Sequence, residues 1–287
     1  MNNPDWPKPI HISAMDFDLA VDALFGEERV NHGSPTEVYD FILNSKEKFS
    51  TLKHSNKLKL YLPNSTCFLM AQFVWQSSIS LAQYLLQNND KLYLRDSNII
   101  ELGAGSGLPS LVCALFQDKN SIEITDFPED SIIQNLKRNI SENLLFPSQN
   151  LKVSGLQWGE SSLLQKYDLV LMADCLWLPK EHHNLLKTMS EVVKEDKGRI
   201  LCAYMNHDHN NSVAASFIKL LPDYHLEFMK SEEIEWRTCK CFLAHNQNKN
   251  KIHLLTFVNN TTDICRRLAR LRSLTDGRYR LLEGGKN

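Results

Sequence analysis

Short apolar segments alternate with amphipathic helical segments through most of this chain, and this alternation is the feature that most restricts its fold. Each apolar segment has the length of a strand, and the intervening segments place apolar residues at helical spacing. Strands alternating with helices are typical of a sheet with right-handed crossovers and helices on both faces. The sequence therefore predicts a Rossmann-like, doubly wound α/β fold with a mostly parallel sheet of seven strands, at 98–102, 121–125, 151–156, 167–173, 198–204, 225–229 and 252–258.

The segments around these strands complete the predicted organisation. Helical spacing is found at 68–86, 108–116, 129–143, 182–194 and 212–221. Residues 1–59 are polar and weakly periodic, so we expect an N-terminal extension of loops, with a short helix near 17–24, over a main domain of residues 60–260. Residues 261–287 form a basic tail with six arginines and an apolar stripe. We expect this tail either to pack as a helix on the sheet edge or to bind an acidic partner.

Composition narrows the possible partners and the compartment. A net charge of −2 gives no electrostatic argument for nucleic-acid binding, and no apolar run is long enough to cross a bilayer. The seven cysteines are an odd number scattered through apparent core segments, which favours reduced thiols in a cytosolic or nuclear protein. Cys239 and Cys241 lack further ligands at zinc spacing, so we expect a strand there and no metal site. We expect a monomer with neither a membrane nor a nucleic-acid partner.

A glycine-rich turn follows the strand at 98–102 and leads directly into a helix. Gly103, Gly105 and Gly107 allow a tight turn and let a ligand approach the backbone at the positive end of that helix. Such a turn is shared with dinucleotide-binding proteins, but Glu101 would repel a pyrophosphate and suits the cationic groups of S-adenosylmethionine (SAM). Asp126, at the end of the next strand, can accept hydrogen bonds from both ribose hydroxyls. The pattern predicts a SAM-binding loop.

Several motifs in a fixed order then resemble one family. They are Glu101-Leu-Gly-Ala-Gly-Ser-Gly-Leu-Pro109, Thr125-Asp-Phe-Pro128 with Asn135-Leu-Lys-Arg-Asn139, Leu156-Gln-Trp-Gly159, Ala173-Asp-Cys-Leu-Trp177 and, upstream, Phe73-Val-Trp75. Together, over about residues 60 to 260, they resemble the class I methyltransferases of lysine methyltransferase family 16, which includes fungal nicotinamide N-methyltransferase-like proteins and elongation-factor methyltransferases. The chain departs from the family at Trp177, where Tyr or Phe is usual, and in its basic tail.

The resemblance and the predicted strand ends assign candidate roles to individual residues. Asp174, at the end of a central strand, would orient an amine and stabilise its developing positive charge, or it would merely cap the following turn. Trp177 would hold an ammonium through its ring or pack in the core. Trp75 would border the methionine end of the cofactor and Trp158 its adenine, and each has a packing role as the alternative. The resemblance also implies cofactor contacts at Phe127 and Ala173.

Three functions remain open from the sequence. The resemblance implies a SAM-dependent N-methyltransferase that acts on a lysine or a terminal amine of a cytosolic protein. A small-molecule N-methyltransferase with a nicotinamide-like acceptor is the first alternative, and a catalytically weak SAM-binding interaction module is the second. His207 and His209 follow the strand at 198–204 and are expected in a substrate-facing loop. His182 and His183 begin a helix and are expected to be exposed to solvent.

Overall fold

The fold is described from a computed structural model of the chain. The described residues are 38–45, 48–63, 70–116, 121–145, 150–160, 165–195, 197–205, 212–234 and 251–260. Several expectations lie outside them: the helix near 17–24, Phe68, the loop with His207 and His209, the pair Cys239 and Cys241, and the basic tail 261–287.

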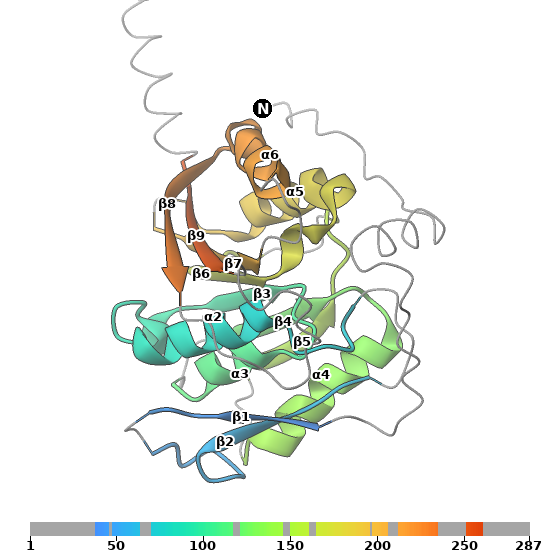
Figure 1. Ribbon diagram of the computed structural model, residues 1–287, viewed down its shortest axis with the longest axis vertical. Coiled ribbons are helices and arrows are strands. Elements are labelled where there is room, and N and C mark those ends of the chain that lie inside the picture. Colours follow the sequence, from blue (N-terminus) through green and yellow to red (C-terminus); the bar gives the residue numbers. More distant parts are fainter. Residues whose placement is uncertain are drawn as a thin grey trace, which may run out of the picture.

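A seven-stranded sheet with the order β5-β4-β3-β6-β7-β9-β8 forms the centre of the molecule (Figure 1). Its first five strands are parallel, whereas β9 is antiparallel to both β7 and β8. This confirms the predicted Rossmann-like, mostly parallel fold. The strands are β3 (Ile99–Leu102), β4 (Ile122–Asp126), β5 (Leu151–Gly155), β6 (Leu169–Ala173), β7 (Arg199–Met205), β8 (Leu226–Ile234) and β9 (Ile252–Asn259).

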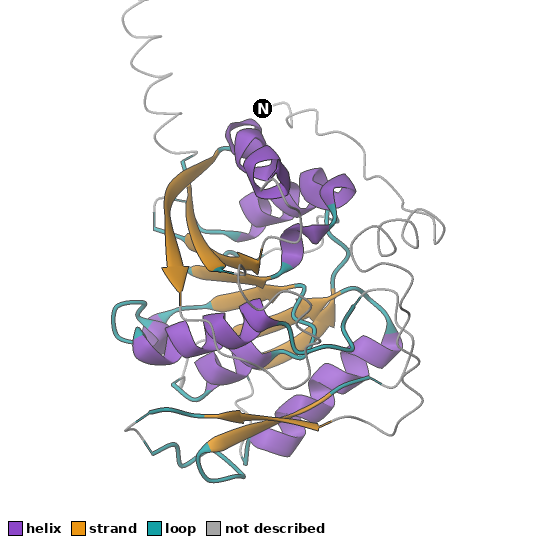
Figure 2. Cartoon of the chain, in the orientation of Figure 1, coloured by secondary structure: helices purple, strands orange, loops and turns teal. Residues whose placement is uncertain are grey.

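Helices cover both faces of this sheet (Figure 2). The α-helices are α2 (Gln76–Gln87), α3 (Leu108–Ala114), α4 (Asp130–Asn143), α5 (His182–Val192) and α6 (Ser212–Leu220). Short 3-10 helices lie at η1 (Leu94–Asp96), η2 (Cys175–Trp177), η3 (Pro179–Glu181) and η4 (Leu221–Tyr224). No helix within the described ranges has both the length and the apolar character that a bilayer crossing requires.

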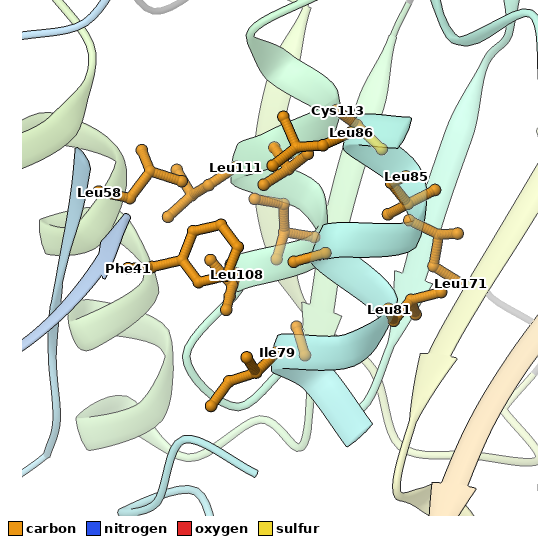
Figure 3. Close-up of a cluster of buried hydrophobic side chains, with 14 of the residues drawn as sticks. Phe41, Leu58, Ile79, Leu81, Leu85, Leu86, Leu108, Leu111, Cys113 and Leu171 are labelled. Atoms are coloured by element: carbon orange, nitrogen blue, oxygen red, sulfur yellow. The ribbon is translucent and has the colours of Figure 1, made fainter. Parts of the chain in front are cut away.

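The side chains of the continuous apolar run in β6 pack into two hydrophobic cores, one on each face of the sheet. Leu169 and Leu171 join the core on the side of α2, α3 and α4, while Val170 and Met172 join the core on the side of α5 and α6. Successive side chains of a strand point to opposite faces, so a strand buried on both faces must be apolar throughout. Figure 3 shows part of the first core, where Leu81 and Leu85 of α2 lie near Leu171.

The structure corrects the predicted helix at 68–86. The helix α2 begins only at Gln76, because Trp75 is its extended N-cap residue with ψ of 145°. Met70 has a left-handed backbone with φ of 58°, which an α-helix cannot contain. Ala71 and Val74 are buried but are not helical. Their apolar spacing matched that of a helix, although the backbone is not helical there.

The expectation of loops in residues 1–59, apart from a short helix near 17–24, was wrong for two segments. β1 (Val38–Ile42) and β2 (Lys57–Tyr61) form an antiparallel pair in which Phe41 lies opposite Leu58. Both side chains are buried in the core that contains α2 and α3, as Figure 3 shows. The alternation of lysine and leucine through β2 is a strand signal, and a domain boundary after residue 59 would cut this strand.

Candidate active site

Three strand ends meet at one edge of the sheet. β3 pairs with both β4 and β6, and Leu102 lies opposite Met172. The loops that follow these strands therefore emerge side by side, beside the amino end of α3 (Figure 1). In an open α/β sheet, ligands bind at the carboxyl ends of the strands, where the order of connection reverses. The candidate residues Glu101, Asp126 and Asp174 all come from this edge.

The glycine loop between β3 and α3 is tightly packed at Gly103 and open at Gly105. A Cβ atom at Gly103 would come within 2.9 Å of the Cys175 sulfur and 3.1 Å of the Trp158 ring, so only glycine fits this position. A Cβ atom at Gly105 would meet no atom within 4 Å, although its φ of +54° still favours glycine. The loop backbone therefore borders open space at Gly105, as a loop that cradles a ligand must.

Asp126 is joined to the glycine loop by its carboxylate. One oxygen accepts a hydrogen bond from the Gly105 N–H at 2.6 Å, and the other accepts one from the Phe127 N–H at 2.7 Å. Burial raises the pKa of Asp126 to about 6, against the lowering effect of these two donors. Each carboxylate oxygen can accept a further hydrogen bond, so the ribose hydroxyls of SAM suit this position. The neighbouring Phe127 ring is exposed and offers an apolar surface.

Glu101 is buried beneath the same loop. Its side chain accepts a hydrogen bond from the Ser110 N–H in the first turn of α3, at 3.0 Å. The carboxylate thus satisfies a helix N–H that has no partner within the helix, a contact that the sequence interpretation did not include. Burial raises the pKa of Glu101 to about 8, and the nearby Asp126 charge adds to this effect. Burial thus disfavours the charged forms of both acids, and a nearby cation such as SAM would lower both pKa values.

Asp174 is held from two sides at the end of β6. The Ser77 hydroxyl donates to one carboxylate oxygen at 2.9 Å, and the Met205 N–H donates to the other at 3.3 Å. Asp174 precedes η2 but makes no side-chain capping hydrogen bond to it, so the alternative of a simple cap was wrong. Its backbone is left-handed, with φ of 57°. Such strained residues outside glycine are concentrated at functional sites.

The three tryptophans have different surroundings. Trp158 lies against Gly103, since a Cβ atom at that glycine would come within 3.1 Å of the indole ring. Trp75 donates its indole N–H to the Met70 carbonyl at 3.0 Å and packs edge-on against Phe73. Trp177 is half-buried at the end of η2, and Ala173 is half-buried at the end of β6. The structure thus places Trp158 against the glycine loop and Trp177 just after β6, while the contacts of all these residues with a ligand stay predictions.

Two residues were missed or misplaced from the sequence. Ser77 reaches Asp174 across 97 positions of the chain, a distance that no local pattern reveals. His182 was expected to be exposed but is buried, with a ring nitrogen 3.0 Å from the Leu176 carbonyl and an edge-on contact to Phe217. Burial lowers the pKa of His182, which keeps it neutral beneath η2. Within the described ranges, no three His, Cys, Asp or Glu side chains gather to hold a metal ion.

The chain is similar in sequence to known methyltransferases. A family model described as lysine methyltransferase matches residues 54–223. A Candida albicans protein named protein N-terminal and lysine N-methyltransferase EFM7 is 29% identical over 186 residues, covering 59% of this chain and 70% of that protein. A protein of the same name from Candida glabrata is 29% identical over 192 residues, covering 63% of this chain and 72% of that protein.

Among solved structures, the fold is similar to that of a candidate RNA methyltransferase from Pyrococcus horikoshii. The TM-score is 0.50 at 14% sequence identity, and the match covers 70% of this chain and 92% of the other. At this identity the likeness extends to the fold alone.

Proposed function

Since the chain belongs to the lysine methyltransferase family and is a SAM-dependent enzyme, we propose that it methylates a protein amine, either a lysine side chain or an N-terminal α-amine. The names of the relatives from Candida albicans and Candida glabrata support both kinds of acceptor. The observation that carries the proposal is Asp174, a buried carboxylate fixed by two donors at the sheet edge that also bears the glycine loop.

We propose that some residues of the site bind the cofactor and that others orient the acceptor amine. When bound, SAM supplies a methyl group on a positively charged sulfur, which makes its carbon electrophilic. We assign the cofactor to the glycine loop, with Asp126 for the ribose and the exposed ring of Phe127 beside it. Glu101, buried under the loop, holds the amino end of α3 through the Ser110 N–H, and a bound cation would lower its raised pKa.

Asp174 acts on the acceptor. An amine must arrive unprotonated, because its lone pair would form the bond to the methyl carbon, and its nitrogen would gain the positive charge that sulfur loses as the methyl–sulfur bond breaks. A fixed carboxylate stabilises that developing charge without having to reorganise. We propose that Asp174 accepts a hydrogen bond from the amine and holds the lone pair in line with the methyl group.

Trp177 shapes the acceptor site in a different way. Its indole can attract a cation through the ring face, which is worth about 0.5–2 kcal/mol, but it cannot accept a proton. The tyrosine or phenylalanine that is usual at this position has a smaller ring. We therefore propose that Trp177 forms an aromatic wall beside Asp174 and takes no part in proton transfer.

Labelling in an extract tests the proposal. The purified chain is incubated with methyl-labelled SAM and a cell extract, and proteins are separated from small molecules. We expect label in a protein band with the wild type and no label there with Asp174→Ala. This variant serves as the comparison because it should keep cofactor binding and lose methyl transfer. Label found only in small molecules would refute the protein acceptor. Cofactor binding without any transfer would instead indicate an interaction module.

We also propose that the enzyme is a monomer of the cytosol or nucleus. Cys113, Cys175 and Cys202 are buried free thiols, the state expected in a reducing compartment. Size-exclusion chromatography with light scattering and imaging of a tagged chain test these two statements.

A further inference from the structure

Three buried asparagines follow one face of α4. Asn135, Asn139 and Asn143 are spaced by four residues, so their side chains lie above one another on the helix. Their exposed fractions are 6%, 1% and 0%. Asparagine is a poor helix former, and a buried amide costs free energy unless it is hydrogen-bonded. These side chains must therefore have partners.

The first set of partners is the backbone of β2. Asn143 accepts from the Lys59 N–H at 2.7 Å and donates to the Lys59 carbonyl at 2.6 Å. Asn139 accepts from the Tyr61 N–H at 2.8 Å and donates to the Tyr61 carbonyl at 3.0 Å. Each amide thus pairs with one residue of β2 as a neighbouring strand would, and α4 fixes the N-terminal strand pair in place.

Asn139 has a second partner in the glycine loop. Its amide nitrogen also donates to the Ser106 carbonyl at 2.9 Å, and Ser106 is buried. The same turn of α4 touches the loop through Leu136, whose Cδ2 lies 3.0 Å from where a Cβ atom of Gly107 would be. Both hydrogens of the Asn139 amide and its oxygen are therefore engaged, and they join β2 directly to the loop.

We propose that Asn139 is a positioning residue of the cofactor site, and that β2 is a structural part of that site. The inference rests on the proposed binding of SAM by the glycine loop. Ser106 lies between Gly105 and Gly107, so a shift of its carbonyl changes the path of the backbone that borders the ligand. Asn139 holds that path by a hydrogen bond anchored on a strand outside the parallel sheet.

A matched pair of variants tests the proposal. Asn139→Ala and Asn143→Ala remove the same side chain from the same helix face, and each amide makes three hydrogen bonds in the structure. Of these two amides, only that of Asn139 donates to the glycine loop in the described part of the chain. Binding of S-adenosylhomocysteine, the demethylated product of SAM, is measured by calorimetry well below each variant's Tm.

We expect a similar fall in Tm for both variants, but a different affinity for S-adenosylhomocysteine in each. Asn139→Ala should raise the Kd for S-adenosylhomocysteine about tenfold, or about 1.4 kcal/mol, whereas Asn143→Ala should change it less than twofold. For methyl transfer, the KM for SAM should rise in Asn139→Ala while kcat at saturating SAM stays near that of the wild type. If Asn139→Ala does not fold, Asn139→Ser, which keeps a small polar side chain but is too short to reach both carbonyls, is measured instead.

Equal changes of affinity in the two variants, or wild-type affinity in the Asn139 variant, would overturn the positioning role. In both cases the wild type still binds S-adenosylhomocysteine, so the cofactor assignment survives. Failure of the wild type to bind S-adenosylhomocysteine or SAM would instead refute the cofactor assignment on which this inference rests.

Discussion

Replacing Ser77 with alanine should slow methyl transfer while leaving cofactor binding almost unchanged. The Ser77 hydroxyl donates to Asp174 at 2.9 Å, and both side chains are buried. The Met205 N–H, at 3.3 Å, would then hold the carboxylate by a longer and weaker contact. Asp174 would lose the donor that fixes its orientation toward the acceptor.

The size of the effect follows from this geometry. A hydrogen bond to a charged group contributes about 1.5–3 kcal/mol, and a barrier change of about 1.4 kcal/mol corresponds to tenfold in rate. If Ser77 acts only through Asp174, kcat should fall roughly 10- to 100-fold. The Kd for SAM should stay within about twofold, because the glycine loop and Asp126 make no contact that this change removes.

The assay measures initial rates with labelled SAM and the protein acceptor found in the extract. Ser80→Ala is the matched control, because Ser80 is a buried serine of the same helix whose hydroxyl has no hydrogen-bond partner among the described residues. It should keep the wild-type kcat. Equal rates for Ser77→Ala and Ser80→Ala would refute the idea that Ser77 orients Asp174, and so would a loss confined to SAM binding.

Two further predictions concern the acids of the cofactor site. The pKa of Glu101 is raised from 4.5 to about 8, so the folded protein keeps a proton that the unfolded chain loses, and stability falls as pH rises through this interval. In chemical unfolding of the ligand-free protein, the free energy of unfolding of the wild type should fall between pH 5 and 8, and Glu101→Gln should remove up to about 4 kcal/mol of that fall. Parallel plots of unfolding free energy against pH for the two proteins would contradict this. With the pKa of Asp126 near 6, affinity for SAM should weaken as pH falls below 6, because the protonated carboxyl accepts fewer hydrogen bonds. Calorimetry should find this dependence reduced in Asp126→Asn, and Asp126→Ala should bind SAM at least about tenfold more weakly at neutral pH.

The parallel sheet could be predicted because its information is local. The apolar run of β6 predicts a buried strand, and the glycine turn after β3 predicts a strand that leads into a helix. Because β3 and β6 are parallel neighbours, their carboxyl ends lie together at one edge of the sheet. Asp126 and Asp174 could be placed at the site for the same reason, since each ends a strand of the sheet.

The rest depends on contacts between distant segments. The period of β2 covers only five residues in a polar region, and its burial depends on α4 and the core beneath it. The start of α2 is set by the backbone at Met70 and Trp75, while the apolar spacing continues across that boundary. The contact of Ser77 with Asp174 joins segments that are remote in sequence, so a single sequence gives no sign of it.

The pairing of α4 with β2 also bears on how the protein behaves in concentrated solution. A strand edge with open N–H and C=O groups is a template on which another chain can add a strand, and this is a common start of aggregation. Here the amides of Asn139 and Asn143 occupy the backbone groups of Tyr61 and Lys59. Side chains of a helix thus close an edge that would otherwise be closed by a strand. Loss of these amides would expose a self-association surface, so colloidal stability depends in part on Asn139, which also supports the cofactor loop.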